Sequence, residues 1–315
     1  MDDVKINTSK TVSLSLGADP DSSLVNATVY HEFGDSGVIQ ASTACTRTAT
    51  GEYSITLGES TVNSSNYVLA QAGVHKVVFS YDISSVAFTK EYYLNVYTPY
   101  IASATFFANN TDLQSLYGAK FDDLEKKARR IIDTYCGQSF DFYGSKSFII
   151  DGTDNRHIRV PYPLDALTTV IADSGDSDAE TIHDSSDTNL NNLEKYNSMG
   201  NFGSSYSIRF KNKVSDTKKN YIARSYGNKF SSKSDYKVTG DFGWRYVPSN
   251  IENASELLIL DLMNDDNEYR RHRIHHVEMD TTRYRFDSDF YGSTGNVDAD
   301  FLLMDYTLYV MDYVG

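Results

Sequence analysis

A short histidine-rich segment in the C-terminal quarter of the chain is the first candidate for metal chemistry. His272 and His276 are four residues apart, a spacing that would place both rings on one face of a helix. The HExxH pattern of zinc proteases is absent, no acidic residue stands at the matching position, and both cysteines are distant. We therefore interpret the segment as a basic surface loop or strand and predict no metal site.

Acidic side chains gather at two other places. One group lies at the end of the second predicted long helix and consists of Asp261, Asp265, Asp266 and Glu268. It lacks the alternating oxygen ligands and central glycine of a calcium loop, so we interpret it as a solvated helix end. The second group, DSGDSDAE in residues 173–180, has enough oxygen atoms for weak calcium binding, but a polar loop is the better interpretation.

Patterns of nucleophilic catalysis and phosphate binding are also absent from the sequence. Serine, histidine and aspartate occur throughout, but no nucleophile-elbow pattern brings them together. The glycine-containing segment 200–205 is not followed by the Lys-Ser/Thr pair of a phosphate-binding loop. We predict that the protein is not an enzyme and needs no cofactor.

The length and net charge of the chain limit the number of domains and the classes of partner that are possible. A chain of 315 residues is long enough for two domains, each with its own core. The net charge of −14 argues against binding nucleic acid by neutralising phosphates, although an acidic channel would let DNA slide without sticking. The 24 tyrosines and 16 phenylalanines fit either protein–protein contacts or an aromatic-rich β protein.

Cysteine usage and hydropathy indicate a protein made in a reducing cytoplasm. Cys45 and Cys136 fall in different predicted domains, so we expect no disulfide between them. The N-terminus lacks the basic and apolar regions of a signal peptide, and no apolar run approaches the length of a membrane span. We expect no membrane partner.

Residues 1–100 are predicted to form an immunoglobulin-like (Ig-like) β-sandwich. Short alternating or β-branched runs recur there and are separated by turn-rich pieces. The expected strands are Thr11–Leu16, Ala27–Phe33, Gly37–Ala41, Tyr53–Leu57, Val74–Ile83 and Val86–Val96. The description concerns architecture alone, because the Cys–Trp–Cys signature of antibody domains is absent.

Residues 101–315 are predicted to form a second domain, a small helical bundle with inserted β-strands, which makes the whole chain α+β. Apolar spacings of three and four predict a helix over 111–136, and a second such stripe after Pro248 predicts another over 249–266. The other expected parts are strands in 140–172 and 204–238, a variable polar insertion at 173–203 and a C-terminal tail at 296–315.

Six basic residues are candidates to face DNA or a neighbouring molecule. Four lie on the first predicted helix and two in the histidine-rich segment: Lys126, Lys127, Arg129, Arg130, Arg271 and Arg273. For the helix we favour an ordinary solvated face, whose positive charge suits the C-terminal end of the helix dipole.

The segment 236–262, YKVTGDFGWRYVPSNIENASELLILDL, carries the clearest pattern in the sequence. It has the form V-x-G-x-x-G-W-x-x-V-P-x-x-I-x-x-A, formed by Val238, Gly240, Gly243, Trp244, Val247, Pro248, Ile251 and Ala254. Two further motifs precede this segment in the chain. One is a helix end with Tyr135, Gly137, Gln138 and Phe140, and the other is a hydrophobic strand pair at Val160–Pro161 and Leu164–Leu167. The glycines allow a tight turn before the tryptophan, and the proline fixes the chain as it enters the helix.

Over residues 110–312 this order of motifs resembles the head–tail connector (adaptor) proteins of tailed bacteriophages. The resemblance implies a structural virion protein of the neck, assembled in the bacterial cytoplasm as a dodecameric ring between the portal and the tail. Such a ring extends the DNA channel for packaging and ejection and offers an attachment surface to tail, nozzle or tail-terminator proteins. Ring closure needs heterologous interfaces between copies.

The C-terminal tail is a candidate portal contact under this resemblance. Its β-prone, aromatic residues are Thr307, Leu308, Tyr309, Val310 and Tyr313. Strand addition to an edge of the portal protein and an ordinary terminal strand in the chain's own sheet both explain this composition. An alternative function for the whole protein is a tail-associated or capsid-decorating protein that binds host or virion partners through the Ig-like domain.

Overall fold

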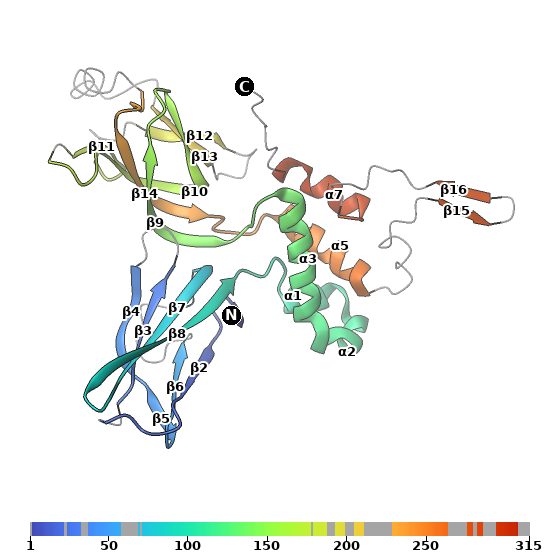
Figure 1. Cartoon of the computed structure of the whole chain (residues 1–315). Helices are drawn as coiled ribbons and strands as arrows, with labels where there is room; N and C mark the ends of the chain where they lie inside the picture. Colours follow the sequence, from blue (N-terminus) through green and yellow to red (C-terminus); the bar gives the residue numbers. More distant parts are fainter. Residues whose placement is uncertain are drawn as a thin grey trace. The chain divides into compact units, whose positions relative to one another are not determined.

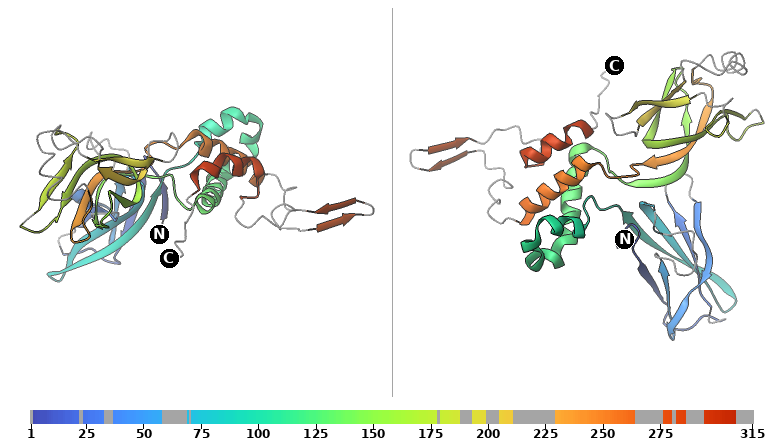
Figure 2. Two further views of the ribbon diagram at one scale, coloured as in Figure 1. Left: turned by 90° about the horizontal axis from the view of Figure 1, so that it is seen from above. Right: turned by 180° about the vertical axis from the view of Figure 1, so that it is seen from behind.

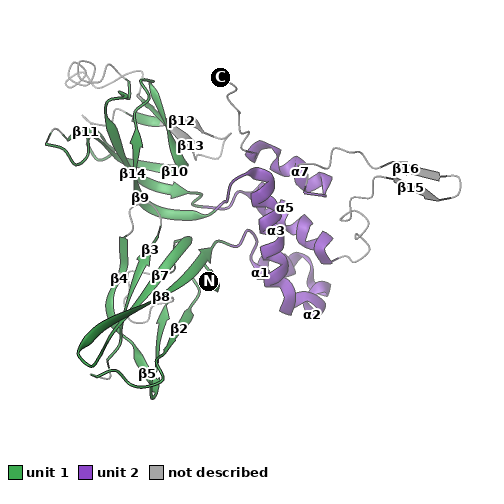
Figure 3. Cartoon of the chain, in the orientation of Figure 1, with its two compact units in different colours: residues 1–98, 141–245 green, residues 99–140, 246–315 purple. Residues whose placement is uncertain are grey.

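The fold is taken from a computed structural model of the chain (Figure 1). The structure describes residues 2–21, 24–32, 37–57, 69, 71–177, 179–187, 193–198, 205–210, 229–263, 276–279, 282–285 and 294–307. The predicted α+β class is confirmed. Contacts divide the chain into two compact units, residues 1–98 with 141–245 and residues 99–140 with 246–315, shown in green and purple in Figure 3.

The N-terminal part of the first unit consists of two sheets around one core. The five-stranded sheet has the order β1 (Asp2–Lys5), β8 (Val86–Tyr97), β7 (Gly73–Ile83), β3 (Asn26–His31) and β4 (Gly37–Ala44). The three-stranded sheet has the order β2 (Lys10–Ser15), β6 (Glu52–Leu57) and β5 (Thr46–Ala49). Alternate residues point inward, as Tyr53, Ile55 and Leu57 do on β6, because successive side chains of a strand face opposite sides.

The strands predicted in residues 1–100 are confirmed, with boundary shifts of a few residues. Two strands were missed. β1 is short, and it joins the sheet by pairing in parallel with the end of β8, a contact between residues far apart in sequence. β5 has no buried residue, so its four residues give no hydrophobic alternation.

The second β part of the first unit is a sheet of six strands. Its order is β12 (Leu193–Ser198), β13 (Ser205–Phe210), β10 (His157–Ala172), β14 (Asp235–Gly243) and β9 (Phe142–Asp151), and β11 (Glu180–Asp184) also pairs with β10. The long β10 pairs with both β13 and β11 along one edge, because His157–Leu164 pair with β13 and Thr169–Ala172 pair with β11. A separate core cluster forms on this sheet.

The structure of this sheet corrects the prediction that residues 173–203 form a polar surface insertion. Two strands, β11 and β12, lie within it and pair with their neighbours. Ile182 and Leu193 belong to the buried cluster, and His183 is buried beside them. Only a few side chains of each strand are buried in the core. The segment is therefore predominantly polar, and its composition does not reveal the strands.

The second unit is helical. It contains α1 (Ser103–Asn109), α3 (Phe121–Cys136), α5 (Ser249–Met263) and α7 (Val297–Leu303), with short helical turns between and after them. The turns are η1 (Thr111–Leu113), α2 (Gln114–Tyr117), η2 (Gly118–Lys120) and η5 (Met304–Tyr306). Helix α5 contacts both α3 and α7, and Figures 1 and 2 show these three helices side by side. The structure also describes a hairpin of β15 (His276–Met279) and β16 (Thr282–Arg285).

The helix predicted over 111–136 is corrected to three short turns followed by α3. The continuous buried row of α3 begins only at Phe121 and continues through Ala128 and Ile132. Leu116, which the apolar spacing placed on the buried stripe, is 71% exposed. The helix predicted over 249–266 is confirmed as α5 up to Met263, and 264–266 lie outside the described residues.

Candidate interaction surface

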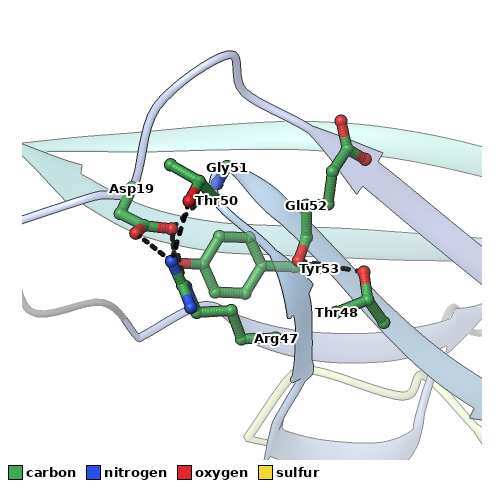
Figure 4. Close-up of polar contacts among 7 residues, drawn as sticks. All are labelled: Asp19, Arg47, Thr48, Thr50, Gly51, Glu52 and Tyr53. Carbon is green, nitrogen blue, oxygen red and sulfur yellow. Dashed lines mark hydrogen bonds and ion pairs between the residues drawn. The ribbon is translucent and has the colours of Figure 1, made fainter.

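The sheet edge near Asp19 holds a dense polar cluster, drawn in Figure 4. The Asp19 carboxylate accepts hydrogen bonds from Arg47 (2.6 and 2.9 Å), the Gly51 backbone N–H (2.8 Å) and the Tyr53 hydroxyl (2.9 Å). Hydrogen bonding from Arg47 is the main reason that the pKa of Asp19 lies far below its usual range. These hydrogen bonds fasten the segment around Asp19, which follows β2, to the β5–β6 hairpin and hold the carboxylate in its ionised form.

Two buried histidines stack against each other in the first unit. The rings of His31 and His75 are 4.6 Å apart, and His31 Nε2 lies 2.8 Å from the Ala72 carbonyl oxygen while His75 Nδ1 lies 3.1 Å from that of Gly73. Burial, then the neighbouring His75, then Lys146 lower the pKa of His31 to about 3. His31 is therefore neutral at physiological pH, and its ring packs against that of His75.

A buried polar group ties together the core of the helical unit. The Glu125 carboxylate accepts the Tyr100 backbone N–H (2.8 Å), and the Tyr100 hydroxyl donates to Asp133 and accepts the Phe140 backbone N–H (2.9 Å). Arg129 stacks on the Tyr100 ring with its guanidinium carbon 5.2 Å from the ring centroid. These contacts join the start of the unit to α3 and to the segment after it.

These contacts correct the prediction that Arg129 faces DNA or a neighbouring molecule. Its side chain is only 13% exposed and lies 3.8 Å from the Asp133 carboxylate. Lys126 is half-buried, whereas Lys127 and Arg130 are exposed on α3. Arg271 and Arg273 lie outside the described residues.

Helix α7 presents two contrasting faces. Ala299, Leu303 and, in the following turn, Tyr306 are buried. The opposite face exposes an apolar ridge, defined as Val297 (77% exposed), Phe301 (75%) and Met304 (50%). These three residues are spaced by four and three, so they form one continuous stripe on the helix surface. Exposed apolar residues scattered singly are normal, but a stripe of three marks a candidate contact surface.

Carboxylates flank this ridge, and ammonium groups flank a comparable surface on α3. Asp298 and Asp305 are exposed, seven residues apart, on one side of the α7 ridge. Lys120, the last residue of η2, and Lys127 in the middle of α3 are exposed with the same separation. Leu124 and Ile131 lie next to these lysines around the helix and are half-buried, so part of each remains accessible.

Polar contacts hold α7 firmly in place beneath the ridge. The Asn296 side chain accepts the Ala299 backbone N–H (3.0 Å) and donates to the Asp261 carboxylate on α5 (2.6 Å). The Thr294 hydroxyl donates to Asp300 (2.6 Å), and Gln138 donates to the Tyr306 carbonyl oxygen (2.6 Å). The ridge is therefore displayed on a fixed support.

The structural motif of the sequence is divided between the two units. Gly240 and Gly243 lie in β14, and Trp244 follows it directly. Val247 and Pro248 come just before α5, and Ile251 and Ala254 lie in its first turns. Trp244, Ile251 and Ala254 are buried, and the backbone N–H of Trp244 donates to the Asp141 carbonyl oxygen (2.8 Å). The Pro248 carbonyl accepts the backbone N–H of Ile251 and of Glu252, which starts α5.

Different structural constraints require glycine at the two glycine positions of the motif. Gly243 has a φ of +95°, and a Cβ there would lie 2.1 Å from the Asp141 carbonyl oxygen. Gly240 lies within β14 and is not part of a turn, which corrects that expectation. A Cβ at Gly240 would lie 2.3 Å from the Ala166 carbonyl oxygen on β10, so the neighbouring strand is the constraint there.

The predicted portal-contact tail lies mostly beyond what the structure describes. Thr307 follows η5 with an extended backbone, and its hydroxyl donates to the Met304 carbonyl oxygen (2.9 Å). Leu308, Tyr309, Val310 and Tyr313 lie outside the described residues. Of the two histidines considered for metal binding, His276 lies in β15, and His272 lies outside the described residues.

Among the described residues, no group of three or more histidine, cysteine, aspartate or glutamate side chains is arranged to hold a metal ion. In the same part of the chain, no helix combines the length and apolarity that crossing a membrane requires. Burial raises the pKa of the Cys136 thiol to about 12 and that of Cys45 to about 11, so neither is an activated nucleophile.

No model of a known protein family matches the sequence. A search of curated proteins likewise gives no significant match. The α7 ridge is visible only through side-chain exposure, because the apolar residues of 297–304 lie on more than one side of the helix and their types do not tell which will be buried.

Proposed function

We propose that this protein is a structural component of a tailed-phage virion that forms a ring between the portal and the tail. The exposed apolar ridge of α7 supports this proposal most directly, because a rigid helical unit that displays such a stripe is suited to association. The motif from Gly240 to Ala254 supports it through its resemblance to the head–tail connector family, with buried positions where the pattern requires packing.

The charge of the chain is compatible with this role. A protein with a net charge of −14 repels the DNA phosphates that would pass through such a ring, so DNA would not adhere to its wall. The proposed partners are other copies of the chain, the portal protein and tail, nozzle or tail-terminator proteins. The proposed location is the virion neck, and no catalytic step is part of the role.

A second candidate function has its own supporting observation. Beyond Ser80 and Thr89, the β7–β8 hairpin continues past the residues of β3 and β1 that pair with it. On this extension Ile83, Val86 and Phe88 are exposed. An N-terminal Ig-like domain with this apolar ribbon would suit a tail-associated or capsid-decorating protein that binds host or virion partners.

Antibody labelling of virions separates the two proposals. Antibodies raised against residues 1–100 are applied to intact particles and located by immunogold electron microscopy. Label at the neck supports the connector, whereas label at the tail tip or over the capsid face supports the binding protein. Particles without label at any of these places, but with label after disruption, would indicate a buried position and call for imaging of isolated necks.

A further inference from the structure

We infer that the apolar ridge of α7 docks along α3 of a second copy of this chain, with Asp298 and Asp305 opposite Lys120 and Lys127. The inference rests on the proposed ring and names the two surfaces that would join its subunits. Such a contact is heterologous, since one face of each copy meets a different face of the next, and it is the type of contact that closes rings.

Charge complementarity identifies the occupant of the ridge. The two carboxylates stand seven residues apart on one side of the ridge, and the two ammonium groups stand seven residues apart along α3. Each row includes one residue of an adjoining 3-10 turn, Lys120 in η2 and Asp305 in η5. At a rise of roughly 1.5 to 2.0 Å per residue both separations are about 10–12 Å, so the two rows match when the helices lie side by side. The accessible parts of Leu124 and Ile131 lie beside the lysines and offer an apolar strip to the ridge.

The two surfaces do not meet within one copy. The ridge is on the side of α7 opposite the buried Ala299 and Leu303, and so it points away from the core of its own unit. Helix α7 contacts α3 through Tyr135, whose hydroxyl lies 3.4 Å from the Asp300 carbonyl oxygen. Lys120 and Lys127 lie near the other, N-terminal half of α3 and are exposed.

A single contact of this size is weak, and ring closure would strengthen it. Burial of Phe301 together with two ion pairs at the rim gives modest affinity for one pair of subunits. In a closed ring each copy is held at two interfaces, so the last contact forms at a high effective concentration.

The test uses two complementary charge-reversal variants of the full-length chain. The first is Asp298→Lys with Asp305→Lys, and the second is Lys120→Glu with Lys127→Glu. Sedimentation velocity over a wide concentration range measures self-association, and far-UV circular dichroism melts check that each variant folds. A double variant with the same charge change at exposed positions elsewhere, Asp82→Lys with Asp176→Lys, serves as the control.

The expected result is that the wild type and the control associate equally, while each complementary variant associates roughly tenfold or more weakly. An equimolar mixture of the two should associate like the wild type, because every acidic face then finds a basic one. The chain with all four reversals should also associate with itself. The variant Phe301→Ser should weaken association by roughly tenfold without any change of charge.

Several outcomes would overturn the inference. If Lys120→Glu with Lys127→Glu associates normally, the ridge contacts something other than α3. If the folded variants do not rescue each other in the mixture, the charged rows do not face one another. A wild type that stays monomeric at every concentration excludes the second copy as the occupant. In each case neck labelling of virions can still succeed, so the inference fails separately from the proposed function.

Discussion

Gly243 shows how tightly one residue can be constrained at the end of β14. Its φ of +95° is strained for any L-residue, and the Asp141 carbonyl oxygen occupies the space that a side chain would need. Gly175 provides a close comparison within the same unit, because its φ is +112° but nothing lies within 4 Å of its Cβ position.

We predict that Gly243→Ala destabilises the protein clearly more than Gly175→Ala. The backbone conformation alone should cost about 1 kcal/mol in both variants. The clash at Gly243 should raise the total to roughly 3 kcal/mol or more, since backbone atoms must move. Urea unfolding followed by tryptophan fluorescence measures the difference, because Trp244 is the single tryptophan and lies next to the site. Equal unfolding midpoints for the two variants would contradict this account of the glycine.

His31 makes the stability of the first unit depend on pH. Its folded pKa of about 3 lies below the ordinary value of 6.5, so the unfolded chain binds more protons between these values. The stabilisation is therefore fully present above pH 6.5 and is lost as the pH falls toward 3. The slope for one such group is at most about 1.4 kcal/mol per pH unit.

The corresponding measurement is an NMR titration of the imidazole resonances. We predict that the His31 resonances do not shift between pH 8 and about 5. The free energy of unfolding should fall over the same range below pH 6.5. A His31 titration midpoint near 6.5 would show that the ring is not desolvated as the structure indicates.

At the scale of elements, one side chain both caps the start of α7 and links this helix to α5. Asn296 caps the helix through Ala299 and links it to Asp261 on α5. A serine can still accept the hydrogen bond of the cap, but it is too short to maintain the link to α5.

We predict a graded series in which Asn296→Ser weakens α7 less than Asn296→Ala. The alanine variant loses both contacts and should cost about 1–2 kcal/mol, whereas the serine variant keeps the cap. Hydrogen exchange of the α7 amides measures the local effect. Since the ridge rests on this helix, self-association should decline in the same order. Unchanged amide protection in Asn296→Ala would mean that other contacts hold α7.

The elements that the sequence predicted correctly are those with a strong local period. Strands β3, β6 and β7 alternate buried and exposed residues, and α5 follows a capped amphipathic pattern. Helix α1 was missed, although Phe106 and Phe107 are buried, because seven residues are too few to establish a period. The turns before α3 were read as helix because apolar spacings continue through Leu116, which the structure leaves exposed.

The candidate surface could be predicted less well than the fold. Arg129 sits at the border of the buried face of α3, and its partner Tyr100 comes from a different part of the chain. A local sequence pattern does not reveal such a contact between segments that are far apart in the sequence. For α7, Val297 and Phe301 are as apolar as the buried Leu303, so only the packed structure distinguishes ridge from core.

At the scale of the whole molecule, the chain crosses between its two compact units three times. The chain enters the helical unit near residue 98, returns to β structure near 141 and enters the helical unit again near 246. The predicted division at residue 100 lies near the first of these crossings, but residues 141–245, which were predicted to share one domain with the helices, group with residues 1–98. The motif from Gly240 to Ala254 spans the last one, so it connects the β14 strand to the α5 helix that supports α7.

The central proposal is that this chain forms a ring in the neck of a tailed phage. Cryo-electron microscopy of intact virions that contain the protein tests it most directly, because density for the β unit and for α3, α5 and α7 is recognisable. The account predicts a closed ring of copies between the portal and the tail, with the α7 ridge of each copy at a subunit boundary. A resolved neck with no density for this chain between portal and tail would contradict it.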